Sequence, residues 1–234
     1  MKEVKGTLTT TITMNEEETR VYEICREFDR AGEEAILVTL YPTLTEPNTF
    51  DLSSVHLMNH STDEDLELSK VHFVFLFSKV TKTKMSSRGL TMDVDNMNFL
   101  KERIAQLPNA KIIISWGSSM QNCPAVIESK VEFFKMIEEI RPKDTLWQLD
   151  VDDSEEEAIH ILFAGIRYNN QQWGLTNYTI PYRYTEKGYQ EYLAKKDEAK
   201  ERFIQNVLGR KKVETDIATT KPKKGKKKSD NTES

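Results

Sequence analysis

The chain has 234 residues, 38% of them hydrophobic and 30% charged, which is enough to bury the core of one full-sized domain without disulfide or metal staples. Its two cysteines, Cys25 and Cys123, form neither a disulfide framework nor a zinc pattern, as is usual in a reducing cytosol. No apolar run approaches the roughly 20 residues of a membrane span, and the first residues lack the apolar stretch of a secretory signal. We therefore expect a cytoplasmic protein with no membrane association, no metal and no cofactor.

The net charge of -5 is unevenly distributed along the chain. Residues 210–234 carry nine Lys/Arg and four Asp/Glu, whereas residues 1–209 carry 24 Lys/Arg and 34 Asp/Glu. An acidic body repels polyanions before any specific contact forms. The basic run KPKKGKKK at residues 221–228 either supplies that missing attraction or acts as a disordered, solubilising end.

Strands are predicted from β-branched and apolar runs. Residues 7–14 are β-branched and predict a strand, whereas residues 19–28 fit either a helix or an edge strand. Four short apolar runs follow, and a continuous apolar run indicates a strand that is covered on both faces. These buried strands are expected at residues 35–41, 71–78, 110–116 and 145–151.

Helical patterns separate the four buried strands. Residues 51–60 predict a short helix capped near Asp51 or Ser53, residues 95–107 carry apolar residues three and four apart, and residues 124–140 begin with a proline. Buried strands that alternate with helices indicate parallel β-α-β units. We predict an α/β fold with three layers (α/β/α) and a central, mostly parallel sheet.

The C-terminal part is more charged. Residues 161–168 are apolar and suit an added strand or a packed extension, while residues 178–184 are extended and aromatic. A long charged helix is expected to end at Gly209. The predicted organisation is an α/β domain at 1–184, a C-terminal helix at 185–209 and a disordered basic tail at 210–234.

Ligands in open α/β sheets bind beyond the carboxyl ends of the strands, and this rule selects four stretches. They are residues 41–43, the chain from Ser78 onward, residues 116–119 and the loop after Val151 that contains His160. No phosphate-cradling or nucleophile-elbow motif occurs in the chain. His56 and His60 are four apart, as metal ligands on a helix can be, but no acidic residue lies between them in a metalloprotease arrangement.

Every candidate residue in these stretches also has a structural interpretation. Tyr41, Pro42 and Thr43 suit a ligand-facing turn or an ordinary strand-terminating turn. Trp116, Gly117 and Ser118 suit indole and amide contacts with a base or phosphate, or a core tryptophan followed by a capping serine.

The remaining candidates are charged or titratable. His160 suits an acid, an electrophile or a phosphate contact, or a satisfied structural histidine. Arg167 suits an anion site or an ion pair with a carboxylate such as Asp51, which itself most simply caps a helix.

In their order, these stretches resemble an uncharacterised bacterial and phage family catalogued as domain of unknown function 1643. Members carry an L-N-P-S-T-A turn followed by D-x-T, an N-L-F strand, an N-D before a helix, an A-W-G and a final H-P-L-Y-L. The matching stretches are residues 40–43, 51–53, 75–77, Asn96, 115–117 and 160–163. The resemblance spans residues 19–168 and implies that residues 19–28 pair with residues 35–41 in an N-terminal antiparallel hairpin.

The same order is similar, more distantly, to the uracil-DNA glycosylase superfamily. That similarity implies a pocket in which an Asp or Asn after the first strand positions water and a histidine after the fourth strand stabilises the departing base. Carried over by position, His160 is the catalytic electrophile and Pro42 the turn former. The chain departs from the pattern at Tyr41, where Asn or Asp is expected, at Met97, which replaces Asp, and at Ile161, which replaces Pro.

Two functions are consistent with these patterns. The first is a nucleobase- or nucleotide-recognising pocket at the strand ends, with nucleic acid as a partner of the tail; if it is an enzyme, it is a glycosylase-like hydrolase. The second is a catalytically inert interaction protein of a phage or plasmid, whose site has decayed and whose partner is a protein. Tyr41 is the residue that discriminates between these two functions, because a phenol is a poor general base at neutral pH and so weakens the enzymatic interpretation.

Overall fold

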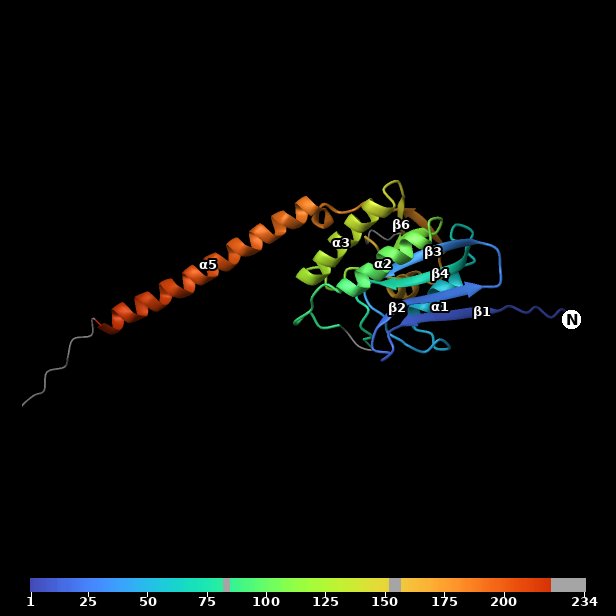
Figure 1. Cartoon of the computed structure of the whole chain (residues 1–234), viewed down its shortest axis with the longest axis horizontal. Helices are drawn as coiled ribbons and strands as arrows, with labels where there is room; N and C mark the ends of the chain where they lie inside the picture. Colours follow the sequence, from blue (N-terminus) through green and yellow to red (C-terminus); the bar gives the residue numbers. More distant parts are fainter. Residues whose placement is uncertain (82–84, 152–156, 220–234) are drawn as a thin grey trace, which may run out of the picture. The chain divides into compact units, whose positions relative to one another are not determined.

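The computed structural model describes residues 1–81, 85–151 and 157–219 (Figure 1). The chain separates into two compact units. The first, Met1–Tyr189, contains the sheet and the helices that cover it, and the second begins at Gln190 within the last helix. No helix among the described residues combines the length and the apolar character that crossing a bilayer requires.

Seven strands of the described residues form one sheet in the order β1-β2-β4-β3-β5-β6-β7. The central strands β4, β3, β5 and β6 run parallel, which confirms the parallel core predicted from the four apolar runs. Antiparallel strands are added at both edges, so the sheet as a whole is mixed rather than mostly parallel. The strands are β1 (Leu8–Met14), β2 (Val21–Phe28), β3 (Glu33–Thr39), β4 (Leu68–Phe75), β5 (Lys111–Ile114), β6 (Leu146–Val151) and β7 (Trp173–Asn177).

Helices cover both faces of this sheet. The predicted helices are present as α1 (Leu52–His60), α2 (Val94–Gln106) and α3 (Pro124–Ile140). Helix α2 contacts α3, and α1 contacts α4 (Ile161–Tyr168). Figure 1 shows α2 and α3 in front of the sheet and α1 behind it.

The apolar residues of the strands alternate between the two covered faces. Leu37, Phe73 and Ile113 belong to one buried cluster with Leu57 of α1 and Ile161 of α4. Their neighbours along each strand are buried as well, because side chains alternate in direction along a strand and both faces carry helices. This double burial is why the core strands are continuous apolar runs.

The pairing expected for residues 19–28 is wrong. Of these residues, Val21–Phe28 form β2, which pairs antiparallel with β1 and with β4, not with β3. Strand β3 is central and is hydrogen-bonded to β4 on one side and β5 on the other, so neither of its edges is free for β2. The N-terminal antiparallel hairpin is therefore made by β1 and β2.

Residues 161–168 form helix α4, so a strand at this position is wrong. A short, mostly apolar run of this kind fits either type of element, and the local signal for a helix is the capping residue His160. The added strand lies further along as β7, which pairs antiparallel with β6. Glycine and asparagine within β7 are poor strand formers, so the sequence pattern did not indicate a strand at these residues.

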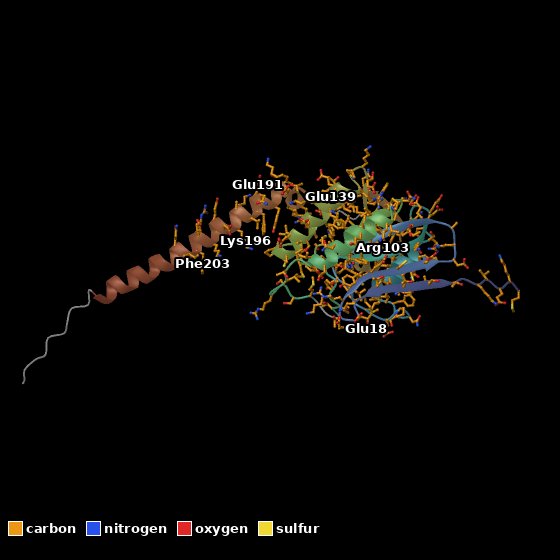
Figure 2. The ribbon with its side chains drawn as sticks, viewed as in Figure 1. Glu18, Arg103, Glu139, Glu191, Lys196 and Phe203 are labelled. Atoms are coloured by element: carbon orange, nitrogen blue, oxygen red, sulfur yellow. The ribbon has the colours of Figure 1, made fainter. Side chains whose placement is uncertain are left out.

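The C-terminal part also differs from expectation. The extended residues 178–184 end in a short 3₁₀ turn, Tyr182–Tyr184. Helix α5 runs from Glu186 to Thr219 and passes through Gly209, so the predicted helix end is wrong; one interior glycine costs about 1 kcal/mol, which flanking helix formers offset. Within the second unit, Phe203 of α5 is 69% exposed (Figure 2). The tail was expected to be disordered over residues 210–234, but residues 210–219 belong to α5. The rest of that prediction, residues 220–234, lies outside the described residues.

Candidate functional site at the carboxyl edge of the sheet

The topology creates a switch point between β3 and β5. The chain leaves β3 for α1 on one face of the sheet, whereas it leaves β5 for α3 on the other face. The two loops therefore diverge at the carboxyl ends of neighbouring strands, where open α/β sheets bind ligands. Residues 41–43 and 116–118, both selected from the sequence, lie in these two loops.

Asp51 organises the loop between β3 and α1. Its carboxylate caps α1 by accepting a hydrogen bond from the Ser54 N–H at 2.7 Å, and it accepts a second from the Thr43 hydroxyl at 2.8 Å. The Asp51 charge also acts on Arg26 and His160, whose pKa values it raises against the larger, opposite effect of burial. Thr43 is thus in direct contact with Asp51, and His160 lies within range of the Asp51 charge.

Arg26 of β2 holds the same loop in place. Its guanidinium donates to the carbonyls of Pro47 at 3.2 Å and Thr49 at 2.8 Å, and it lies 4.1 Å from the centre of the Phe50 ring. Arg26 is fully buried. A charged side chain at this depth needs such hydrogen bonds, so the loop conformation and the Arg26 position depend on each other.

His160 caps helix α4 with its own ring. Its Nδ1 accepts a hydrogen bond from the Leu162 N–H at 3.1 Å. A nitrogen that accepts carries no proton, so this network assigns the proton of the neutral ring to Nε2. Burial lowers the pKa of His160 below its ordinary value, and the Asp51 charge opposes this. His160 is therefore a neutral hydrogen-bond donor at neutral pH.

The loops after β5 and β6 are locked together around Gly117. This residue has a φ of 64°, and a Cβ at this position would lie 2.9 Å from the Cβ of His160. The Gly117 N–H donates to the Ala158 carbonyl at 2.8 Å.

Ser115 makes a second connection between the same two loops. Its hydroxyl donates to the Ile159 carbonyl at 2.8 Å and accepts from the Ile161 N–H at 3.1 Å. His160 is thus held rigidly against the end of β5.

Trp116 does not reach this edge. Its ring is 1% exposed and lies in the core beneath α3, in edge-on contact with Phe133, Phe134, Tyr178 and Tyr184. No face of the indole is left for a ligand. Trp116 therefore has the surroundings of a core tryptophan. Within residues 116–118, Gly117 is the residue that lies against His160.

The other predicted residues are spread over the same edge. Pro42 is buried, Tyr41 is half-buried, and Thr43 and Ser118 are exposed. Arg167 is exposed on α4, and its guanidinium lies 5.5 Å from the centre of the Phe163 ring.

Phe163 was missed by the sequence analysis. It is 40% exposed, and its ring centre lies 6.3 Å from that of His160. Once residues 161–168 are known to be helical, positions 160, 163 and 167 fall on one helix face. Reading the segment as a possible strand concealed this spacing.

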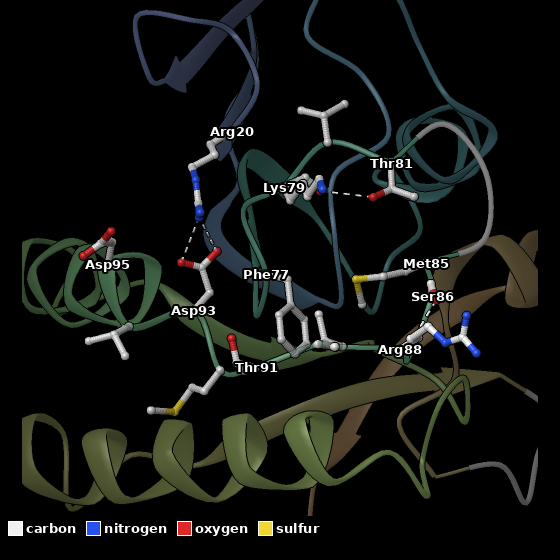
Figure 3. Close-up of a pocket in the computed structure, with 15 residues that line it drawn as sticks. Arg20, Phe77, Lys79, Thr81, Met85, Ser86, Arg88, Thr91, Asp93 and Asp95 are labelled. Atoms are coloured by element: carbon white, nitrogen blue, oxygen red, sulfur yellow. Dashed lines mark hydrogen bonds and ion pairs between the residues drawn. The ribbon is translucent and has the colours of Figure 1, made fainter.

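A cavity of about 730 Å³ opens beside this region, at the end of β4 (Figure 3). Its basic lining residues are Arg20, Lys79 and Arg88, and its acidic ones are Asp93 and Asp95. Three hydroxyls, from Thr81, Ser86 and Thr91, line it as well, and the largely buried Phe77 ring lies behind them. The cavity therefore combines cationic and polar groups with apolar side chains, as small-molecule sites do.

Asp93 is fully engaged within this lining. It accepts from the Arg20 guanidinium at 3.0 Å, and from the Ser78 N–H at 2.9 Å and hydroxyl at 2.7 Å. It also caps α2 by accepting from the Asn96 N–H at 3.3 Å. The charge of Asp93 is therefore matched by Arg20.

Lys79 and Arg88 are exposed in the same lining. Neither has a carboxylate within ion-pair distance in the part of the chain that the structure describes.

The cavity and the switch point share a backbone connection. The Thr81 N–H, in the cavity lining, donates to the Pro42 carbonyl at 3.0 Å. The strand-end rule pointed to the chain from Ser78 onward, but no recognisable motif singled out Lys79 or Arg88 there. Lys79 and Arg88 come together only in the folded chain, which places both in the cavity lining.

The described residues contain no group of three or more His, Cys, Asp or Glu side chains placed to hold a metal ion. His60 is instead stacked on Trp173, with 3.9 Å between ring centres, and its Nδ1 lies 2.8 Å from Asp63. The His60 ring is therefore surrounded by packing and hydrogen-bonding partners, as a structural histidine is.

Comparison with known proteins yields no match to a family model, to a curated protein or to a solved structure at a significant level.

Proposed function

We propose that the carboxyl edge of the sheet recognises a nucleobase or nucleotide, with His160 donating a hydrogen bond from Nε2 to a carbonyl oxygen of the base. The observation that carries this proposal is the cap formed by Nδ1, which leaves the proton on the other ring nitrogen. A neutral, rigidly held imidazole is a good donor to an oxygen that is or becomes negatively charged. Thr43, Asp51 and Gly117 fix its surroundings.

The proposed activity is recognition rather than hydrolysis. Hydrolysis of a glycosidic bond needs a residue that positions and activates water. Tyr41 occupies the position implied by the resemblance, and the Asp51 carboxylate already accepts hydrogen bonds from Thr43 and Ser54. These occupied groups support a site that binds a base through His160.

Phe163 extends this proposal to stacking. Its exposed ring, beside His160 and under Arg167, resembles the aromatic surfaces on which unpaired bases stack. The basic residues 221–228 supply attraction for nucleic-acid phosphate that the acidic body does not. Two free cysteines, both buried, suit the cytoplasmic setting that we propose.

The test compares two substitutions of His160 in calorimetric titrations with the four common nucleosides. His160→Asn keeps a side chain that caps helices well but removes the Nε2 donor, so we expect intact folding and about tenfold or greater loss of affinity. His160→Ala removes both features. Equal affinity of His160→Asn and the parent protein contradicts the proposal.

Catalysis is tested separately on single strands that contain uracil or damaged bases. The expected result is binding without abasic-site formation by the parent protein. Abasic sites that disappear in His160→Asn would show that the chain is a glycosylase-like hydrolase after all.

The alternative function, a protein-binding module without chemistry, is favoured by one observation. Leu52 and Ile166, on the contacting helices α1 and α4, are 60% and 62% exposed. Exposed apolar side chains on neighbouring helices are typical of interaction surfaces. If Ile166→Ser abolishes a cellular interaction while His160→Asn does not, this alternative holds.

A further inference from the structure

The cavity at the end of β4 has a charge character of its own. Arg20 is ion-paired with Asp93. The remaining charged residues of the lining are two basic ones, Lys79 and Arg88, and one acidic one, Asp95. The amides at the start of α2 are not the source of this character, because Asp93 already caps that helix. Side chains, rather than the helix terminus, make the cavity attractive to an anion.

The lining also offers neutral donors. Thr81, Ser86 and Thr91 place hydroxyl groups around the same hollow. Cations together with hydroxyls are the usual protein partners of phosphate oxygens. The Phe77 ring, itself only 2% exposed, adds an apolar floor.

The position of the cavity relates it to the switch point. Strands β4 and β5 are separated by β3 alone, so their ends lie about 10 Å apart. The hydrogen bond between the Thr81 N–H and the Pro42 carbonyl joins the cavity wall to the intervening loop. His160, held against Gly117 after β5, and the cavity at the end of β4 therefore lie along the same carboxyl edge of the sheet.

We propose that the cavity between β4 and α2 binds the phosphate group of a nucleotide whose base lies against His160, so that the ligand is phosphorylated rather than a free base or nucleoside. This inference rests on the proposed function for the position of the base. The phosphate is contacted by Lys79 and Arg88, with hydroxyls as further donors.

The experiment titrates the full chain with nucleosides, their 5′-monophosphates, pyrophosphate and a short single-stranded oligonucleotide. Lys79→Gln and Arg88→Gln are the test variants, because both side chains are exposed and their loss leaves the core intact. Lys143→Gln is the matched control, since Lys143 is exposed in the turn after α3, at the opposite end of that helix from the carboxyl edge. Tighter binding of the monophosphates identifies a free nucleotide as the source of the phosphate. Tighter binding of the oligonucleotide identifies a nucleic-acid backbone as the source.

We expect phosphorylated ligands to bind about tenfold more tightly than nucleosides, and each test variant to remove most of that difference. Lys143→Gln should leave it unchanged. Equal binding of nucleosides and monophosphates, with His160 still required, overturns this inference and leaves the proposed function standing. Binding of pyrophosphate that depends on Lys79 and Arg88, with no affinity for any nucleoside or nucleotide, supports an anion-binding cavity and overturns the proposed function.

Discussion

At the scale of single residues, two histidines show how environment sets charge. His72 is fully buried, with Nδ1 2.5 Å from Glu23 and Nε2 2.9 Å from Glu34. Burial alone would lower its pKa, but hydrogen bonds with Cys25, Glu23 and Glu34 outweigh that effect and raise the pKa to about 10. For His160, burial dominates and lowers the pKa.

The two rings should therefore differ in nitrogen NMR spectra at neutral pH. We expect His72 to carry protons on both ring nitrogens and His160 to be neutral with its proton on Nε2, because their partners impose these states. Long-range ¹H–¹⁵N spectra with His72→Gln and His160→Asn for assignment measure this directly. A His160 signal with the proton on Nδ1 would contradict the cap and, with it, the proposed role.

Substitution of His72 should be strongly destabilising. His72→Gln leaves the buried Glu23 carboxylate with the Arg103 guanidinium, 2.9 Å away, as its remaining charged partner. Breaking a buried charge network in this way costs about 3–5 kcal/mol. Because the pKa of His72 in the folded chain, about 10, exceeds its ordinary value of 6.5, the stabilisation is complete below pH 6.5 and is lost as the pH rises towards 10. Urea unfolding of both proteins across this range gives the difference.

Lys130 titrates in the opposite sense. It is 1% exposed, its Nζ lies 4.5 Å from the centre of the Trp116 ring, and it donates to the Tyr184 hydroxyl at 3.2 Å. Burial, aided by the nearby Arg183 charge, lowers the pKa of Lys130 from 10.5 to about 7. The unfolded chain then holds this proton between pH 7 and 10.5 while the folded chain does not, so the Lys130 contribution to stability rises with pH in that window.

Lys130→Met should abolish this rise and stabilise the fold at and below pH 7, because it removes a charge that the core accommodates poorly. The quantity to compare is the free energy of unfolding of variant minus parent, measured at several pH values from 6.5 to 10. Lys143→Met, an exposed counterpart, serves as the control. A difference that does not change with pH would show that Lys130 is charged in the fold.

At the scale of elements, the contact between α1 and α4 depends on a glycine. A Cβ added at Gly165 would lie 2.0 Å from Cγ of His56, so the two helices approach more closely than any side chain at position 165 allows. The His56 Nδ1 makes no hydrogen bond within the described residues. His56 therefore contributes its shape rather than a polar contact to this interface.

Gly165→Ala should destabilise the fold by about 1–3 kcal/mol through overpacking. His56→Ala removes the opposing ring, so the double variant should be more stable than the sum of the two single effects. Thermal unfolding of the four proteins completes the cycle. Gly6→Ala, where a Cβ meets nothing within 4 Å, should leave stability unchanged, and additive effects at positions 56 and 165 would disprove the close contact.

The elements themselves were predictable to different degrees. Helix α3 begins at the predicted Pro124, and the four parallel strands follow from continuous apolar runs, because burial on both faces leaves a strong compositional signal. Strand pairing is a long-range property, and nothing local to residues 19–28 distinguishes β4 from β3 as the neighbour. Helix α4 was ambiguous for a different, local reason, because its eight mostly apolar residues fit both the helical and the strand periodicity.

At the scale of the whole molecule, charge is divided between an acidic body and a basic end. Removing residues 220–234 deletes six lysines and two acidic residues and leaves α5 complete. If the tail supplies phosphate attraction, the truncated chain should bind single-stranded DNA more weakly and with a smaller dependence of affinity on salt concentration. A chain with the same tail residues in scrambled order should behave like the parent. Unchanged salt dependence after truncation would remove the tail from any role in binding.

The candidate site was predictable in place but not in composition. The strand-end rule located all four stretches from the order of strands and helices, since a parallel sheet gathers its carboxyl ends on one edge. It could not show that Trp116 turns into the core, because the direction of a side chain beyond a strand depends on packing with α3 and residues 178–184. Nor could it single out Lys79 and Arg88, which share a cavity lining only in the folded chain.

The hydrogen bond from the Thr81 amide to the Pro42 carbonyl makes that amide a natural reporter. Its proton exchanges with solvent only when the loops after β3 and β4 part, whichever of the two moves first. A guest that settles at either end of this edge will slow the exchange, so a single deuterium-labelling rate can reveal occupancy before the guest is identified.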